Sequence, residues 1–215
     1  MSNKTSLSFV DQCLIQVDQA LRSCVPGASE ARRSSPAEKL DETSMTESER
    51  KHAAGLMRIN HTGEVCAQAL YQGQATTAKL EDVRASMEQA ADEEVDHLAW
   101  CEERLQQLDS QTSILNPLWY GLSFGMGAAA GIAGDKWSLG FVAETEDQVC
   151  EHLEEHLEEL PDEDLKSKAI LQQMIIDEKN HGDSARQAGG SELPAPINHG
   201  MTLMSQVMKK TTYRI

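Results

Sequence analysis

The sequence predicts an all-α protein built around a four-helix bundle. Aromatic residues make up only 4% of the chain, whereas Ala, Leu, Glu and Gln, which favour helix over strand, fill long stretches. Four long segments repeat apolar residues at helical spacing, and such lengths suit a bundle. The 215 residues fit one domain, and a hydrophobic content of 40% is enough to form its core.

The first predicted helix is short and precedes a linker. Apolar residues fall on one face of a helix over residues 11–24. Residues 26–41 are polar and contain Pro, Gly and Ser, which is typical of a linker. We therefore predict that the chain divides into residues 1–45, a short helix with its linker, and residues 46–215, which form the bundle.

The bundle helices follow along the rest of the chain. Thr46 and Glu49 form a capping box, after which the first bundle helix runs to about residue 78. A proline ends the third bundle helix and two glycines end the fourth. The second, third and fourth helices are expected over residues 80–108, 136–160 and 162–188.

Two further segments complete the bundle part. Residues 110–134, between the second and third bundle helices, carry no charge and many glycines, and we predict a long apolar crossover there. It packs closely on the bundle through its glycine spacing or contacts a membrane interface, and both alternatives are open. A membrane span is less favoured, because a proline interrupts the start of the segment. Residues 191–215 are rich in Met and are expected to form a helical C-terminal cover.

Charge and cysteine content restrict the partners and the compartment. The net charge of −16 argues against a nucleic-acid partner, because a phosphate backbone would repel the chain. The five cysteines are odd in number and form no C-x-x-C pair, which indicates a reducing compartment. Residues 1–13 lack an apolar stretch followed by a cleavage site, so we expect no secretory signal.

Polar residues interrupt the apolar stripe of each bundle helix. Burying an unpaired carboxylate costs several kcal/mol, and the stripes offer no Lys or Arg beside these glutamates. Two divalent cations would neutralise four carboxylates. The interrupting residues, in chain order, are Glu64, Glu94, His97, Glu146, Glu178 and His181.

The spacing of these residues supports a metal centre. Glu94 with His97 and Glu178 with His181 form two E-x-x-H pairs, which place both side chains on one helix face. A glutamate in the stripe precedes each pair by 30 or 32 residues, so the two halves repeat. The pattern matches the ligand set of ferritin-like di-iron and di-manganese bundles, and iron is the better choice for oxygen chemistry.

From about Arg58 to the C-terminus the chain resembles a known family, the demethoxyubiquinone hydroxylases, or 2-polyprenyl-3-methyl-6-methoxy-1,4-benzoquinone monooxygenases. Some members carry a Tyr where this chain has Leu153, so no role of that tyrosine is transferred. The likeness rests on Arg58-Ile-Asn-His61-Thr-Gly63-Glu64, Glu94-Val-Asp-His97, Val142-Ala-Glu-Thr-Glu146 with His152, and Asp177-Glu178-Lys-Asn-His181.

The resemblance implies a ferritin-like di-iron monooxygenase with two Fe²⁺ ions. The six residues from the stripes would be the metal ligands and would act in catalysis through the metals. The enzyme would hydroxylate the ring of a polyprenylated methoxy-methyl benzoquinol (demethoxyubiquinol) with O₂, late in ubiquinone biosynthesis. Its electrons would come from NADH, a reductase or the quinol itself.

The resemblance also implies a peripheral protein at the cytoplasmic face of the cell membrane. Other ubiquinone-biosynthesis proteins and a second copy of the chain are further partners that it suggests. Two alternatives compete with the hydroxylase: a ferritin-like iron-oxidising, storage or peroxide-scavenging protein, and a metal-free helical adaptor. The adaptor predicts that removing a buried glutamate is harmless or stabilising.

Other residues near the stripes have weaker assignments. His61 and His152 are candidates to hydrogen-bond a ligating carboxylate, although for His61 an ordinary surface or core histidine is an equal alternative. Tyr71 is expected to be a core tyrosine, with a hydrogen bond near the metals as the alternative, because it lies seven residues after Glu64 on the same face. Cys150 is expected to be a small buried hydrophobe, and Tyr213 is a further candidate to reach the site. Three histidines outside the stripes are expected on the surface: His52, His156 and His199.

Overall fold

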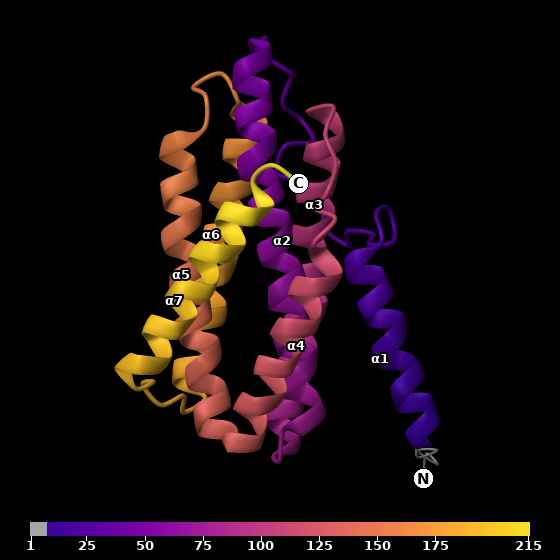
Figure 1. Ribbon diagram of the computed structural model, residues 1–215, viewed down its shortest axis with the longest axis vertical. Coiled ribbons are helices and arrows are strands. Elements are labelled where there is room, and N and C mark those ends of the chain that lie inside the picture. The colour runs from indigo at the N-terminus through magenta and orange to yellow at the C-terminus, as the bar shows by residue number, and fades with distance from the viewer. Residues whose placement is uncertain (1–7) are drawn as a thin grey trace.

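The computed structural model describes residues 8–215, and every regular element within them is an α-helix (Figure 1). The predicted all-α class is confirmed. Residues 1–7, on which the expected absence of a secretory signal partly depends, lie outside the described residues. The helices are α1 (Phe9–Cys24), α2 (Glu47–Thr77), α3 (Glu81–Gln107), α4 (Asn116–Ala133), α5 (Asp135–Glu159), α6 (Leu165–Gln187) and α7 (Ala195–Thr212).

Helices α2, α3, α5 and α6 form the bundle. Helix α2 packs on α3, and α5 packs on α6. Helix α4 lies along α2, and α7 crosses the front of the bundle near α2 and α5 (Figure 1). Helix α1 stands to one side of the bundle, and its contacts are with α2 and α4.

Two apolar clusters fill the bundle, one toward each end. Both draw residues from all four bundle helices. The first contains Met57 of α2, Trp100 of α3, Leu153 of α5 and Met174 of α6. The second contains Tyr71, Met87, Val142 and Ala185 from the same helices. Each of the six polar stripe residues falls in sequence between a member of the first cluster and a member of the second.

Local caps set the helix ends. The backbone N–H of Thr46 donates to Oε2 of Glu49 at 2.8 Å, and that of Glu49 donates to the Thr46 hydroxyl at 3.3 Å, which confirms the capping box. The backbone N–H of Ser167 donates to the Asp164 carboxylate at 3.0 Å. Because Asp164 caps α6, this helix begins at Leu165 and not at residue 162, where the proline boundary had suggested.

Helix α4 occupies much of the uncharged segment and lies against α2 along its length. A Cβ added to Gly127 would overlap the carbonyl oxygen of Leu70, and one added to Gly73 would overlap that of Phe124. Only glycine permits such a close approach of two helix backbones. Among the described residues, no helix combines the length and hydropathy that a membrane span requires.

The linker after α1 follows the surface of α3. The backbone N–H of Gly27 donates to Glu102 Oε1 at 2.6 Å, and the Trp100 indole N–H donates to the carbonyl of Arg33 at 3.2 Å. The buried guanidinium of Arg104 pairs with Glu42 at 2.7 Å. The predicted boundary at residue 45 therefore separates two stretches of sequence that are in contact in space.

Candidate metal centre

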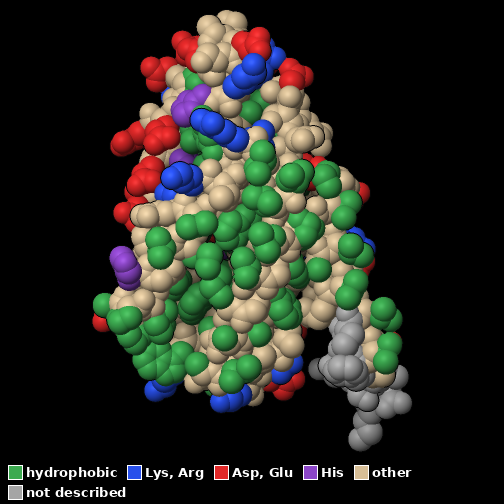
Figure 2. Space-filling model, in the orientation of Figure 1, with side chains coloured by type: hydrophobic (Ala, Val, Ile, Leu, Met, Phe, Trp, Pro, Cys, Tyr) green, Lys and Arg blue, Asp and Glu red, His purple; other side chains and the backbone are tan. Residues whose placement is uncertain are grey.

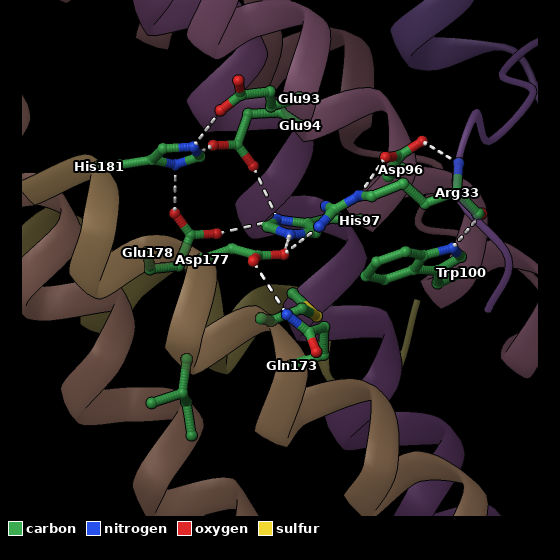
Figure 3. Close-up of polar contacts among 12 residues, drawn as sticks. Arg33, Glu93, Glu94, Asp96, His97, Trp100, Gln173, Asp177, Glu178 and His181 are labelled. Atoms are coloured by element: carbon green, nitrogen blue, oxygen red, sulfur yellow. Dashed lines mark hydrogen bonds and ion pairs between the residues drawn. The ribbon is translucent and has the colours of Figure 1, made fainter. Parts of the chain in front are cut away.

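The six predicted residues lie between the two apolar clusters, on all four bundle helices. The ligand atoms of four of them lie within 4.8 Å of one another: Glu64, Glu94, His97 and Glu178. His181 joins this group, because its Nδ1 is 3.1 Å from both Glu94 Oε1 and Glu178 Oε2 (Figure 3). Glu146 is buried on α5 and lies near enough for its charge to repel those of Glu94 and Glu178.

Three carboxylates converge on a single nitrogen of His97. Its Nδ1 lies 2.9 Å from Glu94 Oε2, 3.0 Å from Glu178 Oε1 and 3.5 Å from Glu64 Oε2. A ring nitrogen carries at most one hydrogen and can donate well to only one of them. The arrangement suits a cation that all of these groups would share.

Each of the four glutamates also has a buried oxygen without a hydrogen bond of its own, because the Nδ1 atoms near Glu94 Oε1 and Glu178 Oε1 are shared with other carboxylates. Leaving a charged acceptor buried without a partner is costly. Bound divalent cations would satisfy these atoms, so the residues present fit a metal centre. The oxygens are Glu64 Oε2, Glu94 Oε1, Glu146 Oε2 and Glu178 Oε1.

The crowded charges shift the pKa values of the cluster. Burial, with repulsion from neighbouring carboxylates, raises the pKa of Glu64 and of Glu146. Burial opposes the charge of His181, but the neighbouring carboxylates of Glu178 and Glu94 raise its pKa to about 12. The pKa of His97 is likewise raised, against burial, by Glu94 and Glu178. The protein without metal therefore carries extra protons here, and bound cations would replace them.

The outer nitrogen of each histidine contacts an acidic residue from the opposite half of the bundle. Nε2 of His97 lies 3.0 Å from Oδ2 of Asp177, and Nε2 of His181 lies 2.8 Å from Oε2 of Glu93 (Figure 3). Such partners fix the ring orientation and the tautomer of a ligating histidine. The sequence analysis missed both, although each stands directly before the glutamate of an E-x-x-H pair.

Tyr71 is a core residue, as predicted, and it also makes the hydrogen bond near the metal centre that was its less favoured alternative. Its hydroxyl donates to Glu146 Oε1. Burial, together with the charge of Glu146, raises the pKa of Tyr71. Its position two turns after Glu64 on the same face of α2 is the sequence signal that indicated this alternative.

Two of the other predicted histidines contact neutral groups. His61 is buried, and its Nδ1 lies 3.3 Å from the amide nitrogen of Asn116. The Nδ1 of His152 faces the carbonyl of Gln148, one turn earlier on α5, at 3.2 Å. Burial lowers the pKa of each histidine to about 4. Both are therefore neutral at physiological pH.

The surface prediction was wrong for His156 and correct for His199, which is exposed. His156 follows His152 by one turn, is 4% exposed, and lies 2.7 Å through its Nδ1 from Oδ1 of Asn60. His52 is half-buried, and its Nδ1 lies 2.7 Å from the hydroxyl of Tyr213. Cys150 is buried, as predicted.

An apolar pocket lies between α2, α4, α5 and α7, beside the centre. Its lining includes Trp119, Met126, Phe141, Val149 and His152, together with the three methionines of α7. A narrow crevice shares four of its lining residues with this pocket and is also lined by Tyr71 and Glu146. The apolar pocket therefore adjoins the α5 side of the centre.

A helical bundle with this buried layer belongs to the class of carboxylate–histidine proteins that can hold metal ions. A sequence model of the family described as "Ubiquinone biosynthesis protein COQ7" matches residues 51–212. The chain belongs to this family, which confirms the resemblance seen in its motifs. It is 61% identical to proteins named 3-demethoxyubiquinol 3-hydroxylase from Ectopseudomonas mendocina (strain ymp) and Pseudomonas fluorescens (strain SBW25), over 100% of both chains. Identity to the protein of that name from Azotobacter vinelandii is 60%, again over 100% of both chains.

Proposed function

We propose that the chain is a di-iron monooxygenase that hydroxylates the ring of demethoxyubiquinol, a polyprenylated methoxy-methyl benzoquinol, with O₂. The reaction is a late step of ubiquinone biosynthesis. The observation that carries the proposal is the buried layer of four glutamates and two histidines, in which every glutamate has an oxygen without a hydrogen-bond partner. The names of its relatives describe the same chemistry.

Two iron ions are the proposed cofactor. Each half of the bundle supplies one glutamate and one E-x-x-H pair, and this mixture of oxygen and nitrogen donors suits iron. When bound, the iron pair supplies the activation of O₂. Asp177 and Glu93 hold the two histidines in the orientation that metal binding needs. The proposed ligands are Glu64, Glu94, His97, Glu146, Glu178 and His181.

The apolar pocket is the proposed substrate site. Its aromatic and Met side chains suit a polyprenyl tail, and they exclude water from the chemistry. The quinol ring would lie at the end of the apolar pocket nearest Glu146, where the pocket and the crevice share lining residues such as Ala67 and Thr145. An organic substrate thus explains the apolar pocket, whereas an iron-storage protein would have no use for it.

Peripheral membrane contact at the cytoplasmic face of the cell membrane is a further part of the proposal. Hydrophobic side chains gather on the face formed by α4 and α7, which also borders the apolar pocket (Figure 2). Lys210 and Arg214 add exposed positive charge at the end of α7 for anionic lipid. The exposed large apolar residues of α4 and α7 are Leu118, Leu122, Ile132, Ile197, Leu203, Met204 and Val207.

Helix α1 offers an exposed apolar surface to which an additional partner could bind. Its exposed apolar residues include Leu14, Val17 and Leu21. Another ubiquinone-biosynthesis protein or a second copy of the chain would cover such a face.

Metal analysis combined with a hydroxylation assay on a short-tailed demethoxyquinol tests the enzyme. We expect two irons per chain and a hydroxylated ring under reducing conditions. Two irons without hydroxylated product would favour the iron-oxidising or storage alternative. A purified protein that neither contains nor takes up iron would favour the metal-free adaptor.

Vesicle co-sedimentation tests the membrane face. Leu203→Glu on α7 is expected to reduce binding to vesicles that contain anionic lipid, because a charge would enter the apolar interface. Ile176→Glu on α6 is the matched control, since Ile176 is 56% exposed and Leu203 is 57% exposed. Equal binding by both variants and the wild type would contradict this part of the proposal.

A further inference from the structure

Arg33 connects the linker after α1 to the candidate metal centre. Its Nε lies 2.6 Å from Oδ2 of Asp96, and its Nη1 lies 2.9 Å from Oδ2 of Asp177. The same oxygen of Asp177 lies 3.0 Å from Nε2 of His97 (Figure 3). Arg33 and His97 therefore contact a single carboxylate oxygen from two sides.

The position of Arg33 is fixed by residues of α3 next to His97. The backbone N–H groups of Arg32 and Arg33 donate to Oδ1 of Asp96, at 2.6 and 3.3 Å. The guanidinium carbon lies 4.8 Å from the centre of the Trp100 ring, and this ring lies 5.5 Å from that of His97. The linker segment that carries Arg33 is thus attached to the turn of α3 that carries His97.

We propose that Arg33 is a positioning residue for the metal centre. It holds Asp177 against Nε2 of His97, and thereby sets the orientation of the ring whose Nδ1 faces the three carboxylates. The inference rests on the proposed metal centre and assigns part of its assembly to a residue outside the range 51–212 that the family model matches.

The guanidinium group is well suited to this position. Its planar fork contacts Asp96 and Asp177 together, whereas the single ammonium of a lysine is a point charge that lacks this geometry. Asp177 also accepts a hydrogen bond from Gln173 at 3.0 Å, so loss of Arg33 would loosen Asp177 without freeing it completely. We therefore expect an effect at the lower end of the 10- to 100-fold range that is typical of partners behind a metal ligand.

Cobalt(II) binding to the full-length apoprotein provides a test that does not depend on activity. Affinity is measured by competition with a chelator, and coordination by the visible d–d spectrum. Arg33→Gln is expected to weaken cobalt binding about 10-fold and to alter the spectrum, and Arg33→Lys should recover part of the loss. Arg32→Gln is the matched control, because the Arg32 side chain is exposed and pairs with exposed Asp92.

A double-mutant cycle separates positioning from general stability. If Arg33 acts through Asp177, Arg33→Gln has no further effect on cobalt affinity in an Asp177→Asn background. Circular dichroism confirms that each variant is folded, and if Arg33→Gln does not fold, the cycle is run with Arg33→Lys. Wild-type affinity and spectrum in folded Arg33→Gln would overturn the inference, as would additive losses. A wild-type protein that binds no cobalt would instead contradict the proposed metal centre.

Discussion

The two halves of the bundle bring the same residue types to the centre but hold them differently. In the α2–α3 half, the His97 side chain is fully buried, and its partner Asp177 is 15% exposed and tied to Arg33. In the α5–α6 half, the His181 side chain is 12% exposed, and its partner Glu93 is 44% exposed and contacts Gln89. The internal repeat thus sets the ligand types, whereas the surroundings set how firmly they are held.

The glutamates of the two halves differ as well. Glu146 accepts a hydrogen bond from Tyr71 and borders the crevice beside the apolar pocket. The nearest ionic partner of Glu64 is Nδ1 of His97, at 3.5 Å. We infer that the α2–α3 half anchors the centre, and that Glu146 of α5 is the ligand nearest the proposed substrate pocket.

Glu178→Ala should have the largest effect, because Glu178 contacts the ligating histidine of each half of the bundle. Its two oxygens lie 3.0 Å from Nδ1 of His97 and 3.1 Å from Nδ1 of His181. We expect metal content to fall sharply and hydroxylation to be lost. Metal analysis of the purified variant checks this, with exposed Glu158→Ala as the control. Full metal content and activity in Glu178→Ala would contradict the proposed ligand set.

Asp177→Asn and Glu93→Gln test the difference between the halves directly. Loss of a carboxylate behind a ligating histidine typically weakens metal affinity about 10- to 100-fold. Asp177→Asn should lie within this range, and Glu93→Gln should cost less because solvent screens the exposed Glu93. Chelator competition on both variants measures the difference. An equal loss of metal affinity in the two variants, or a larger loss for Glu93→Gln, would contradict the claim that His97 is held more firmly than His181.

Tyr71→Phe should have a smaller effect, confined to the α5 side. In the apoprotein Glu146 Oε2 already lacks a donor, so the variant would leave both oxygens unsatisfied and cost about 1–3 kcal/mol. Urea unfolding of the apoprotein measures the loss of stability, and metal retention by the loaded protein should fall as well. Tyr213→Phe also removes a tyrosine hydroxyl, the one that contacts His52, but it should leave metal retention unchanged. Retention equal in both variants would show that Tyr71 does not support the centre.

For the metal-loaded protein the smallest expected effect is that of pH, because the pH dependence is confined to the apoprotein. The His181 pKa is raised from 6.5 to about 12 by its carboxylate partners, against burial, so its contribution to stability is fully present below pH 6.5 and is lost as the pH rises toward 12. The raised pKa values of Glu64 and Glu146 act in the same direction above pH 4.5. The apoprotein should therefore lose Tm between pH 6 and 9, whereas bound metal should suppress this loss. Thermal melts of the apoprotein and the metal-loaded protein across this range provide the measurement. If Tm changes with pH equally in both forms, the protons on these ligands do not cause the change.

The sequence predicted the bundle and its six inward polar residues because both depend on periodicity within single helices. Glu64, Glu94 and Glu178 occupy stripe positions, and helical geometry alone turns them inward. Asp177 and Glu93 could have been found from their positions before the E-x-x-H glutamates.

Other contacts of the site depend on tertiary packing that no local pattern contains. Arg33 reaches Asp177 across the fold from a linker with no helical period. His156 is buried because Asn60, on another helix, supplies its partner. The bond from Tyr71 to Glu146 likewise joins two helices whose register is set only when the bundle assembles.

The central claim is that the buried layer holds two iron ions. Anomalous X-ray diffraction at the iron edge, on crystals of the iron-loaded protein, tests it most directly. We expect two peaks among the side chains of Glu64, Glu94, His97, Glu146, Glu178 and His181. Iron bound only at surface carboxylates, with no peak inside the bundle, would contradict it.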